Sequence, residues 1–299
     1  MRIDPNIVPD LLAELQQSQE TLNAALQQVS TGLSVNQPSD NPTASAEMVQ
    51  NTIATGNLDV YTQNVGTSLS TVQTASSVLN SVVSSLTAAV SAGVEGANGT
   101  NNASDLQTIA NQVQGILTSV ITAANTSVSG VYLFGGTGST TPYTADPASP
   151  TGYTYNGNNE INSVAIGDQT SVQINLPGSQ IFSNTNNNVI GSLSSLVSAL
   201  QSGNSANIET ATASVDSALS YVGQQQVFYG NAETQLNSQE TFLQQDKVTL
   251  STQANDLIGV NESVAATDLS QAETDNSAAL AAVAKVLPNS LLNYLAPPA

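Results

Sequence analysis

The chain has 299 residues, of which only 4% are aromatic and 8% charged, and its 22 acidic residues against three basic ones give a formal net charge of −19. This balance excludes nucleic acid and anionic membrane surfaces as partners, because almost no basic side chains are available to replace their counterions. The chain contains no Cys and no His, so it lacks the residues of Ser-His-Asp and Cys-His catalytic systems and of the usual zinc sites. We therefore expect no enzyme, no cofactor and no metal site.

The first ten residues, MRIDPNIVPD, contain one Arg, two prolines and no apolar run of signal-peptide length. No run of about 18 apolar residues occurs anywhere, so no membrane-spanning helix is expected. If the protein leaves the cytoplasm, we expect it to do so without a cleaved leader of the usual kind.

Heptad spacing predicts a first helix that begins near Leu11. Its apolar seam steps by four and three residues, with two further leucines widening the stripe: Leu11, Leu15, Ser18, Leu22, Ala25 and Val29, then Leu26 and Leu33.

A rigid corner follows in the stretch STGLSVNQPSDNPTASAEM, residues 30–48. Pro38 cannot continue the first helix and restricts the preceding residue to extended conformations. Asn41 is a suitable N-cap for a second helix with Pro42 at its first position. Ser39 and Asp40 are suited to accept hydrogen bonds from backbone donors in the turn. The corner therefore directs the chain from one helix into another.

Two more helices are predicted before residue 131. The longer one carries a seam at Val65, Leu69, Val72, Ser76, Leu79, Val83, Leu86 and Val90. The next begins near Ser104, a predicted N-cap, and continues through Leu106, Ile109, Val113, Leu117 and Val120.

Residues 131–182 lose helical spacing and show the period-two alternation of strands. Asn156-Gly157 lies between alternating runs, which predicts a hairpin with a type I′ turn. A second turn is predicted at Gly167-Asp168. The Gly-rich segment 135–140 lacks the Lys of a P-loop, so a plain turn is the favoured interpretation. The polar segment 183–188 is a linker back to helix.

The C-terminal part returns to heptads. Four leucines lie seven apart, with polar residues at the alternate seam positions: Leu236, Leu243, Leu250 and Leu257, then Gln226, Glu233, Glu240 and Lys247. This helix ends at Gly259, and it covers about 50 residues, or about 75 Å at 1.5 Å per residue. Packing within the same chain is favoured over a dimerising zipper. A last helix carries Ala265, Leu269, Ala272, Asn276, Ala279, Val283 and Val286.

Residues 28–48 resemble the signature of the bacterial flagellin superfamily, in which a heptad helix, an Asn/Pro-Ser-Asp-Asp-Pro corner and a second helix follow one another. Three further stretches resemble its hook-filament junction branch, hook-associated protein 3: GVYLFGG at 130–136, the insert at 154–182, and SLLNYL at 290–295. The insert signature consists of Tyr132, Phe134, Gly135, Gly178 and Phe182.

The resemblance implies a mainly α, elongated flagellin-like helical rod with coiled-coil termini and one small β-rich insert. Residues 1–36 and 261–299 would form an axial coiled-coil domain that is disordered until assembly. Residues 37–130 and 189–260 would form the rod, and 131–188 an outer domain. The assembly interface would use apolar residues of the terminal helices: Leu11, Leu15, Leu22, Leu26, Val29, Leu33, Leu269, Val283, Leu287, Leu291, Leu292 and Leu295.

The implied function is that of a structural protein of the extracellular flagellum, an adaptor ring at the hook-filament junction. Its implied partners are the preceding hook-associated junction protein, flagellin, copies of itself and a flagellar export chaperone, with secretion by type III export. The alternative within the superfamily is a filament-forming flagellin. A secreted coiled-coil adhesin and an enzyme are the alternatives outside it.

Overall fold

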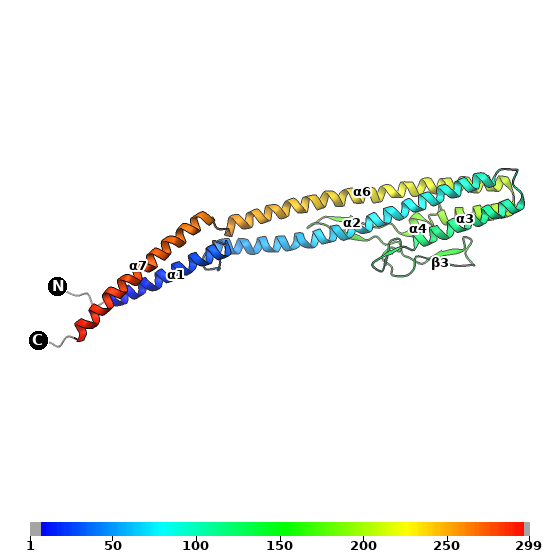
Figure 1. The fold of residues 1–299 in the computed structure, drawn as a ribbon. Helices are drawn as coiled ribbons and strands as arrows, with labels where there is room; N and C mark the ends of the chain where they lie inside the picture. Colours follow the sequence, from blue (N-terminus) through cyan, green and yellow to red (C-terminus); the bar gives the residue numbers. More distant parts are fainter. Residues whose placement is uncertain (1–6, 296–299) are drawn as a thin grey trace. The chain divides into compact units, whose positions relative to one another are not determined.

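A computed structural model describes residues 7–295, with side chains for residues 9–286. The chain forms two compact units, a terminal unit of residues 1–57 and 245–299 and a central unit of residues 58–244. Figure 1 shows their elements. The helices are α1 (Ile7–Thr31), α2 (Pro42–Gly96), α3 (Ala103–Ala124), α4 (Gly178–Ile181), α5 (Val189–Ser202), α6 (Ser205–Ile258) and α7 (Glu262–Leu295). The strands are β1 (Ser127–Val128), β2 (Val131–Tyr132), β3 (Tyr143–Ala145), β4 (Tyr153–Tyr155), β5 (Ser163–Ala165) and β6 (Ser171–Gln173).

In the terminal unit, α1 packs along α7 (Figure 1). The segment after α1 pairs with the junction of α6 and α7, through an antiparallel bridge between Leu33 and Gly259. The backbone N–H of Ser34 donates to the carbonyl of Ile258 at 2.7 Å, and that of Val260 donates to the carbonyl of Gly32 at 3.0 Å. Helix α6 ends at Ile258, as Gly259 predicted.

The predicted corner is present between α1 and α2. A carboxylate oxygen of Asp40 accepts hydrogen bonds from the backbone N–H groups of Asn36 at 3.0 Å and Gln37 at 2.8 Å. The Asn41 side chain accepts from the backbone N–H of Ala44 at 3.1 Å, and α2 begins at Pro42. Asn41 is therefore the N-cap of α2, with proline at the first helical position, where its missing N–H costs nothing.

Replacing Asp40 with Ala should destabilise the corner by about 1–2 kcal/mol, because two backbone donors lose a charged acceptor. Hydrogen exchange at Asn36 and Gln37 should quicken. Asp40→Asn keeps an acceptor oxygen and should restore most of the protection. Equal exchange in the Ala variant and the wild type would contradict this role of Asp40.

The central unit contains a long pair formed by α2 and α6. Val65, Val72, Leu79 and Leu86 are fully buried, as predicted. The alternate seam positions were predicted wrongly by one residue, since Ser68, Ala75, Val82 and Ala89 are buried and Leu69, Ser76, Val83 and Val90 are half-buried. At Ser68, Ala75 and Ala89 the buried residue is smaller than the predicted one, and small residues let the helices approach closely. Val82 and Val83 do not differ in size, so the helix packing alone selects between them.

The polar residues Gln226 and Glu233 of α6 lie beside the seam and bond across it. Gln226 Nε2 donates to Asn80 Oδ1 at 3.0 Å, and Gln73 Nε2 donates to Glu233 Oε1 at 3.0 Å. These bonds also establish that α2 and α6 are antiparallel. Side-chain amides thus make cross-helix contacts for which most helix pairs use ion pairs.

One helix of the described chain, α2, is long and apolar enough to cross a membrane by length and composition alone. The sequence of α2 contains no unbroken run of about 18 apolar residues. The expectation that no helix could span a membrane considered only such runs, and it therefore missed α2. About a third of the apolar window in α2, 33%, is buried inside the protein.

Helix α3 packs against α5 with the predicted seam buried. Its N-cap is Asn102, not Ser104. The Asn102 side chain accepts from the backbone N–H groups of Ser104 and Asp105, and Asp105 accepts in return from the backbone N–H of Asn102. This reciprocal capping box is the stronger arrangement, because it satisfies donors on both sides of the helix start.

The insert is built from three two-stranded antiparallel hairpins, β1–β2, β3–β4 and β5–β6. The turn predicted at Gly167-Asp168 connects β5 to β6. The hairpin predicted at Asn156-Gly157 is wrong, because β4 pairs with the preceding β3. The tight two-residue turn lies instead at Ser129-Gly130, where both residues have positive φ, 52° and 83°. That pair of conformations is the one a type I′ turn requires.

The three-domain division stays a prediction. Its boundaries at residues 36 and 260 coincide with the corner and the α6–α7 junction, whereas the two compact units divide inside α2 and α6.

Candidate assembly interface

The described residues of the predicted assembly interface lie on α1, on α7 and at the corner. Leu11, Leu15 and Leu22 of α1 and Leu269 and Val283 of α7 are half-buried, and Leu11 lines the groove between the two helices. Leu33 is half-buried at the corner, whereas Leu26 and Val29 are exposed. The side chains of Leu287, Leu291, Leu292 and Leu295 lie outside the described residues. The two terminal stripes thus meet each other within one chain.

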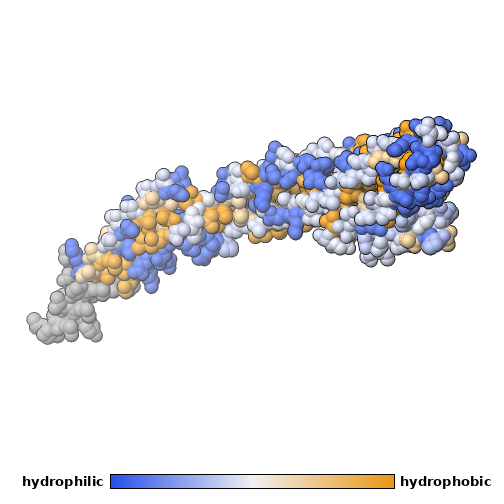
Figure 2. Space-filling view, turned by 45° about the vertical axis from the view of Figure 1, so that its right-hand side comes forward, coloured by the Kyte–Doolittle hydropathy of each residue, from blue (hydrophilic) through white to orange (hydrophobic). Residues whose placement is uncertain are grey.

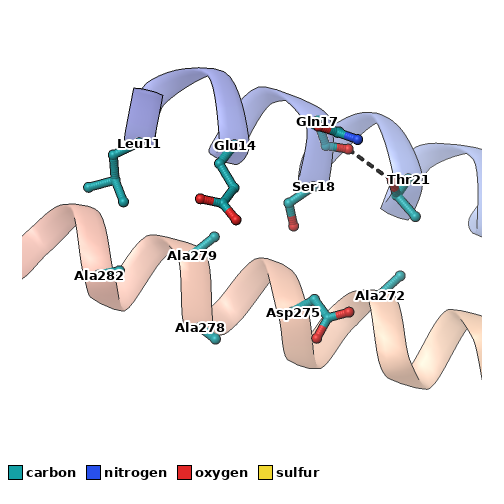
Figure 3. Close-up of a pocket in the computed structure, with 10 residues that line it drawn as sticks. All are labelled: Leu11, Glu14, Gln17, Ser18, Thr21, Ala272, Asp275, Ala278, Ala279 and Ala282. Atoms are coloured by element: carbon teal, nitrogen blue, oxygen red, sulfur yellow. Dashed lines mark hydrogen bonds between the residues drawn. The ribbon is translucent and has the colours of Figure 1, made fainter. Parts of the chain in front are cut away.

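The seam between α1 and α7 is loosely packed. No described leucine in it is fully buried, in contrast to the α2–α6 seam. A groove of about 510 Å³ runs between the helices. Figure 3 shows Leu11 opposite Ala282 at one end and Thr21 opposite Ala272 at the other, so the helices are antiparallel. Four alanines of α7 line the groove, and their short side chains leave it unfilled: Ala272, Ala278, Ala279 and Ala282.

A polar layer interrupts this seam. Ser18 Oγ and Asn276 Oδ1 are shielded from solvent and have no hydrogen-bond partner. In Figure 3, Ser18 faces the turn of α7 that carries Asp275 and Ala279. Asn276 follows Asp275 directly in the sequence. A buried polar group without a partner costs about 1–3 kcal/mol. The layer and the groove together make the terminal pair the weakly held part of the terminal unit.

Replacing Ser18 and Asn276 with Leu should stabilise the α1–α7 pair by about 1–3 kcal/mol per orphaned polar group removed. Hydrogen-exchange mass spectrometry should show slower exchange along both helices. The matched control is Gln19→Leu with Ser277→Leu, which adds the same side chains at the exposed neighbouring positions. Faster exchange in the seam variant, or equal slowing in the control, would show that the layer is not a weak point.

A second set of apolar side chains on the terminal helices faces solvent. Leu12, Leu26 and Val29 of α1 are 45–46% exposed, and Val264 and Leu280 of α7 are 55% and 48% exposed. Figure 2 shows hydrophobic surface over this part of the chain. Leu12, Val264 and Leu280 were missed by the sequence reasoning because they lie off the heptad seam. Exposed apolar side chains close together are typical of interaction surfaces.

The insert signature residues form the core of the insert. The rings of Phe134 and Phe182 are fully buried and meet edge to face, with centroids 5.2 Å apart. The backbone N–H of Gly178 donates to the carbonyl of Phe134 at 2.7 Å. A Cβ at Gly178 would lie 2.9 Å from that carbonyl oxygen and 3.1 Å from the Tyr143 ring. Gly178 therefore has to be glycine for Phe134 and Phe182 to meet.

Tyr132 and Gly135 complete the predicted set. The Tyr132 hydroxyl bonds to Thr141 Oγ1 at 3.0 Å, and the Gly135 carbonyl accepts from the backbone N–H of Asn158 at 3.1 Å. Both contacts join strands and loops of the insert, so these residues have a structural role there.

The sequence reasoning missed two tyrosines that hold the insert in place. The Tyr143 hydroxyl donates to the carbonyl of Gly178 at 2.8 Å, and the Tyr229 hydroxyl of α6 accepts from the backbone N–H of Leu176 at 3.1 Å. Burial raises the pKa of both hydroxyls, because the charged form loses its hydration. The sequence did offer one signal for these tyrosines: aromatic residues are rare in this chain, at 4%.

Residues 9–139 match the model of the bacterial flagellin N-terminal helical region. This range contains the corner on which the resemblance depends. A comparison with curated proteins finds no match.

Solved structures resemble the chain over most of its length. A protein of Vibrio parahaemolyticus described as a flagellar hook-associated protein has a TM-score of 0.68 at 18% identity, covering 74% of this chain and 100% of its own. The fold is that of flagellar hook-associated proteins. FlgL of Bacillus cereus has a TM-score of 0.60 at 22% identity, over 69% and 99% of the two chains. Hook-associated protein 3 of Legionella pneumophila has a TM-score of 0.64 at 15% identity, over 70% and 98%.

The hook-associated fold confirms the predicted fold class, a helical flagellin-like chain with a small β insert. Within the described residues, no cluster of three or more acidic side chains is arranged to hold a metal ion. The exposed apolar side chains of the terminal helix pair make that pair the candidate functional surface.

Proposed function

We propose that this protein is a structural component of a bacterial flagellum that forms an adaptor ring at the junction of hook and filament. The observation that carries the proposal is the hook-associated fold, which includes the insert as well as the helices, in a chain whose residues 9–139 match the flagellin N-terminal region. In this role, flagellin would assemble on the ring.

The terminal helices are the proposed contact surface. Their intramolecular seam is incomplete and their outer faces carry Leu12, Leu26 and Val29, so a neighbouring subunit would bury apolar area that one chain leaves exposed. The preceding junction protein and further copies of this chain would supply those neighbours. Export through the flagellar channel with a dedicated chaperone, and ordering of the termini only on assembly, belong to the same proposal.

The test is electron microscopy of the purified protein mixed with short filament seeds in ammonium sulfate, which strengthens apolar burial. In the proposed role the protein forms no long filaments on the seeds. In a parallel sample it caps hook-junction particles, which are hooks that carry the preceding junction protein, and added flagellin then grows from them. Long helical filaments of the protein alone would instead favour the filament-forming flagellin. Failure to bind the particles, together with an absence of filaments, would count against both roles.

A further inference from the structure

The loop between α2 and α3, residues 97–102, presents an Asn-Gly pair to solvent. Asn98 and Gly99 are both exposed, and a Cβ built on Gly99 would meet no atom within 4 Å. Asn98 Oδ1 accepts hydrogen bonds from the Thr100 backbone N–H at 3.3 Å and from Thr100 Oγ1 at 3.1 Å. The side chain is thereby folded over the backbone that follows it.

We propose that Asn98 is a site of spontaneous deamidation. The backbone nitrogen of Gly99, after giving up its proton to base, attacks Cγ of Asn98. The new C–N bond closes a five-membered succinimide, and the bond from Cγ to the side-chain nitrogen breaks as ammonia leaves. Water then opens the ring at either carbonyl and leaves aspartate or isoaspartate at position 98.

Three features of the loop favour this reaction. The hydrogen bonds from Thr100 withdraw electron density from the side-chain carbonyl, which makes Cγ more open to attack. Gly99 has no Cβ to block the approach, and the space around it lets its backbone rotate toward the ring-closing geometry. The loop is exposed, so water and base reach it freely.

The second Asn-Gly pair of the chain, Asn156-Gly157, has closer contacts around its side chain and backbone, and it serves as an internal comparison. The side-chain amide nitrogen of Asn156, the leaving group of the reaction, donates to Thr144 Oγ1 of β3 at 2.7 Å. Around Gly157, an added Cβ would lie 2.9 Å from the carbonyl oxygen of Gly135. The insert therefore restricts the rotation that ring closure needs.

The product would alter a neighbouring surface. Asn98, Glu209 and Asp216 line one groove of about 510 Å³ between the end of α2 and the start of α6, together with Val90 and Val94. Deamidation adds a third carboxylate to a groove whose lining contains no basic residue. A like charge added there weakens binding of any anionic partner and strengthens binding of a cationic one.

Peptide mapping by mass spectrometry tests the proposal on the full-length folded chain, aged at mildly alkaline pH in ¹⁸O-labelled water. Asn98 should convert several-fold faster than Asn156, gaining one labelled oxygen and a mixture of aspartate and isoaspartate. In urea the two sites should convert at similar rates, because the protection of Asn156 comes from the fold. Gly99→Ala should slow conversion at position 98 several-fold, and Gly157→Ala in urea should do the same at position 156.

Two results would overturn the proposal. Equal rates at Asn98 and Asn156 in the folded chain would show that the insert gives no protection and the loop no advantage. Slower conversion of Asn98 in the folded chain than in urea would show that the loop protects its amide. The reaction does not depend on assembly, so neither result bears on the proposed adaptor role.

Discussion

Replacing Leu26 and Val29 with Gln should weaken addition of the protein to hook-junction particles while leaving the central unit of the free chain folded. Both side chains are about half exposed in one chain, so the substitution costs little within it. Burial of the remaining exposed half of the two side chains on a neighbour would contribute about 1.5–3 kcal/mol, which corresponds to a roughly ten- to hundredfold loss of affinity. Sedimentation of labelled protein with the particles measures the loss.

The matched control removes two exposed apolar side chains from the central unit. Val60 and Val227 are 56% and 60% exposed, and Val60→Gln with Val227→Gln should leave binding close to that of the wild type. If both double variants bind equally well, the terminal helices do not form the contact surface. Circular dichroism of each variant establishes that the helices remain intact.

Replacing Phe182 with Ala should destabilise the central unit by about 3–5 kcal/mol, the usual cost of removing a large side chain from a core. Phe182 is fully buried, meets Phe134 edge to face and has the Tyr143 ring 6.1 Å away. The surrounding hairpins have only two or three residues per strand, so they depend on these rings for their stability. Urea unfolding followed by tyrosine fluorescence measures the change.

Phe242 supplies the control for this substitution, because it is a phenylalanine of the same central unit that is 56% exposed. Phe242→Ala should change the free energy of unfolding by less than about 0.5 kcal/mol. If Phe182→Ala has as small an effect as Phe242→Ala, the insert signature has some role other than forming the core of the insert.

The spacing of apolar residues predicts much of the helical architecture. Val65, Val72, Leu79 and Leu86 recur at seven-residue intervals and are all buried, because that interval keeps one face of a helix toward its neighbour. The corner was equally predictable, since proline restricts its own and the preceding residue locally, and Asp40 and Asn41 bond to backbone groups a few residues away. Such features depend only on near neighbours in the chain.

In each wrong prediction, two positions in the sequence suited the same structural role almost equally well. Asn156-Gly157 and Ser129-Gly130 both suit a tight turn, and only the pairing of β3 with β4 decides against the first. Ser68 and Leu69 both lie near the α2 seam, and the close approach of α6 selects the smaller residue. Strand pairing and the distance between packed helices depend on residues far apart in the chain, so a local sequence pattern cannot predict them.

By itself, then, the sequence determined the helices, the corner, the place of the insert and the absence of the residues that most catalytic and zinc sites require. The tertiary structure decided which faces those helices bury. It brought Phe134, Gly178 and Phe182 into one core and placed the unpartnered Ser18 and Asn276 in the α1–α7 seam. The physical reason is that periodicity and capping act within a few turns of one helix, whereas burial depends on which distant segment packs against it.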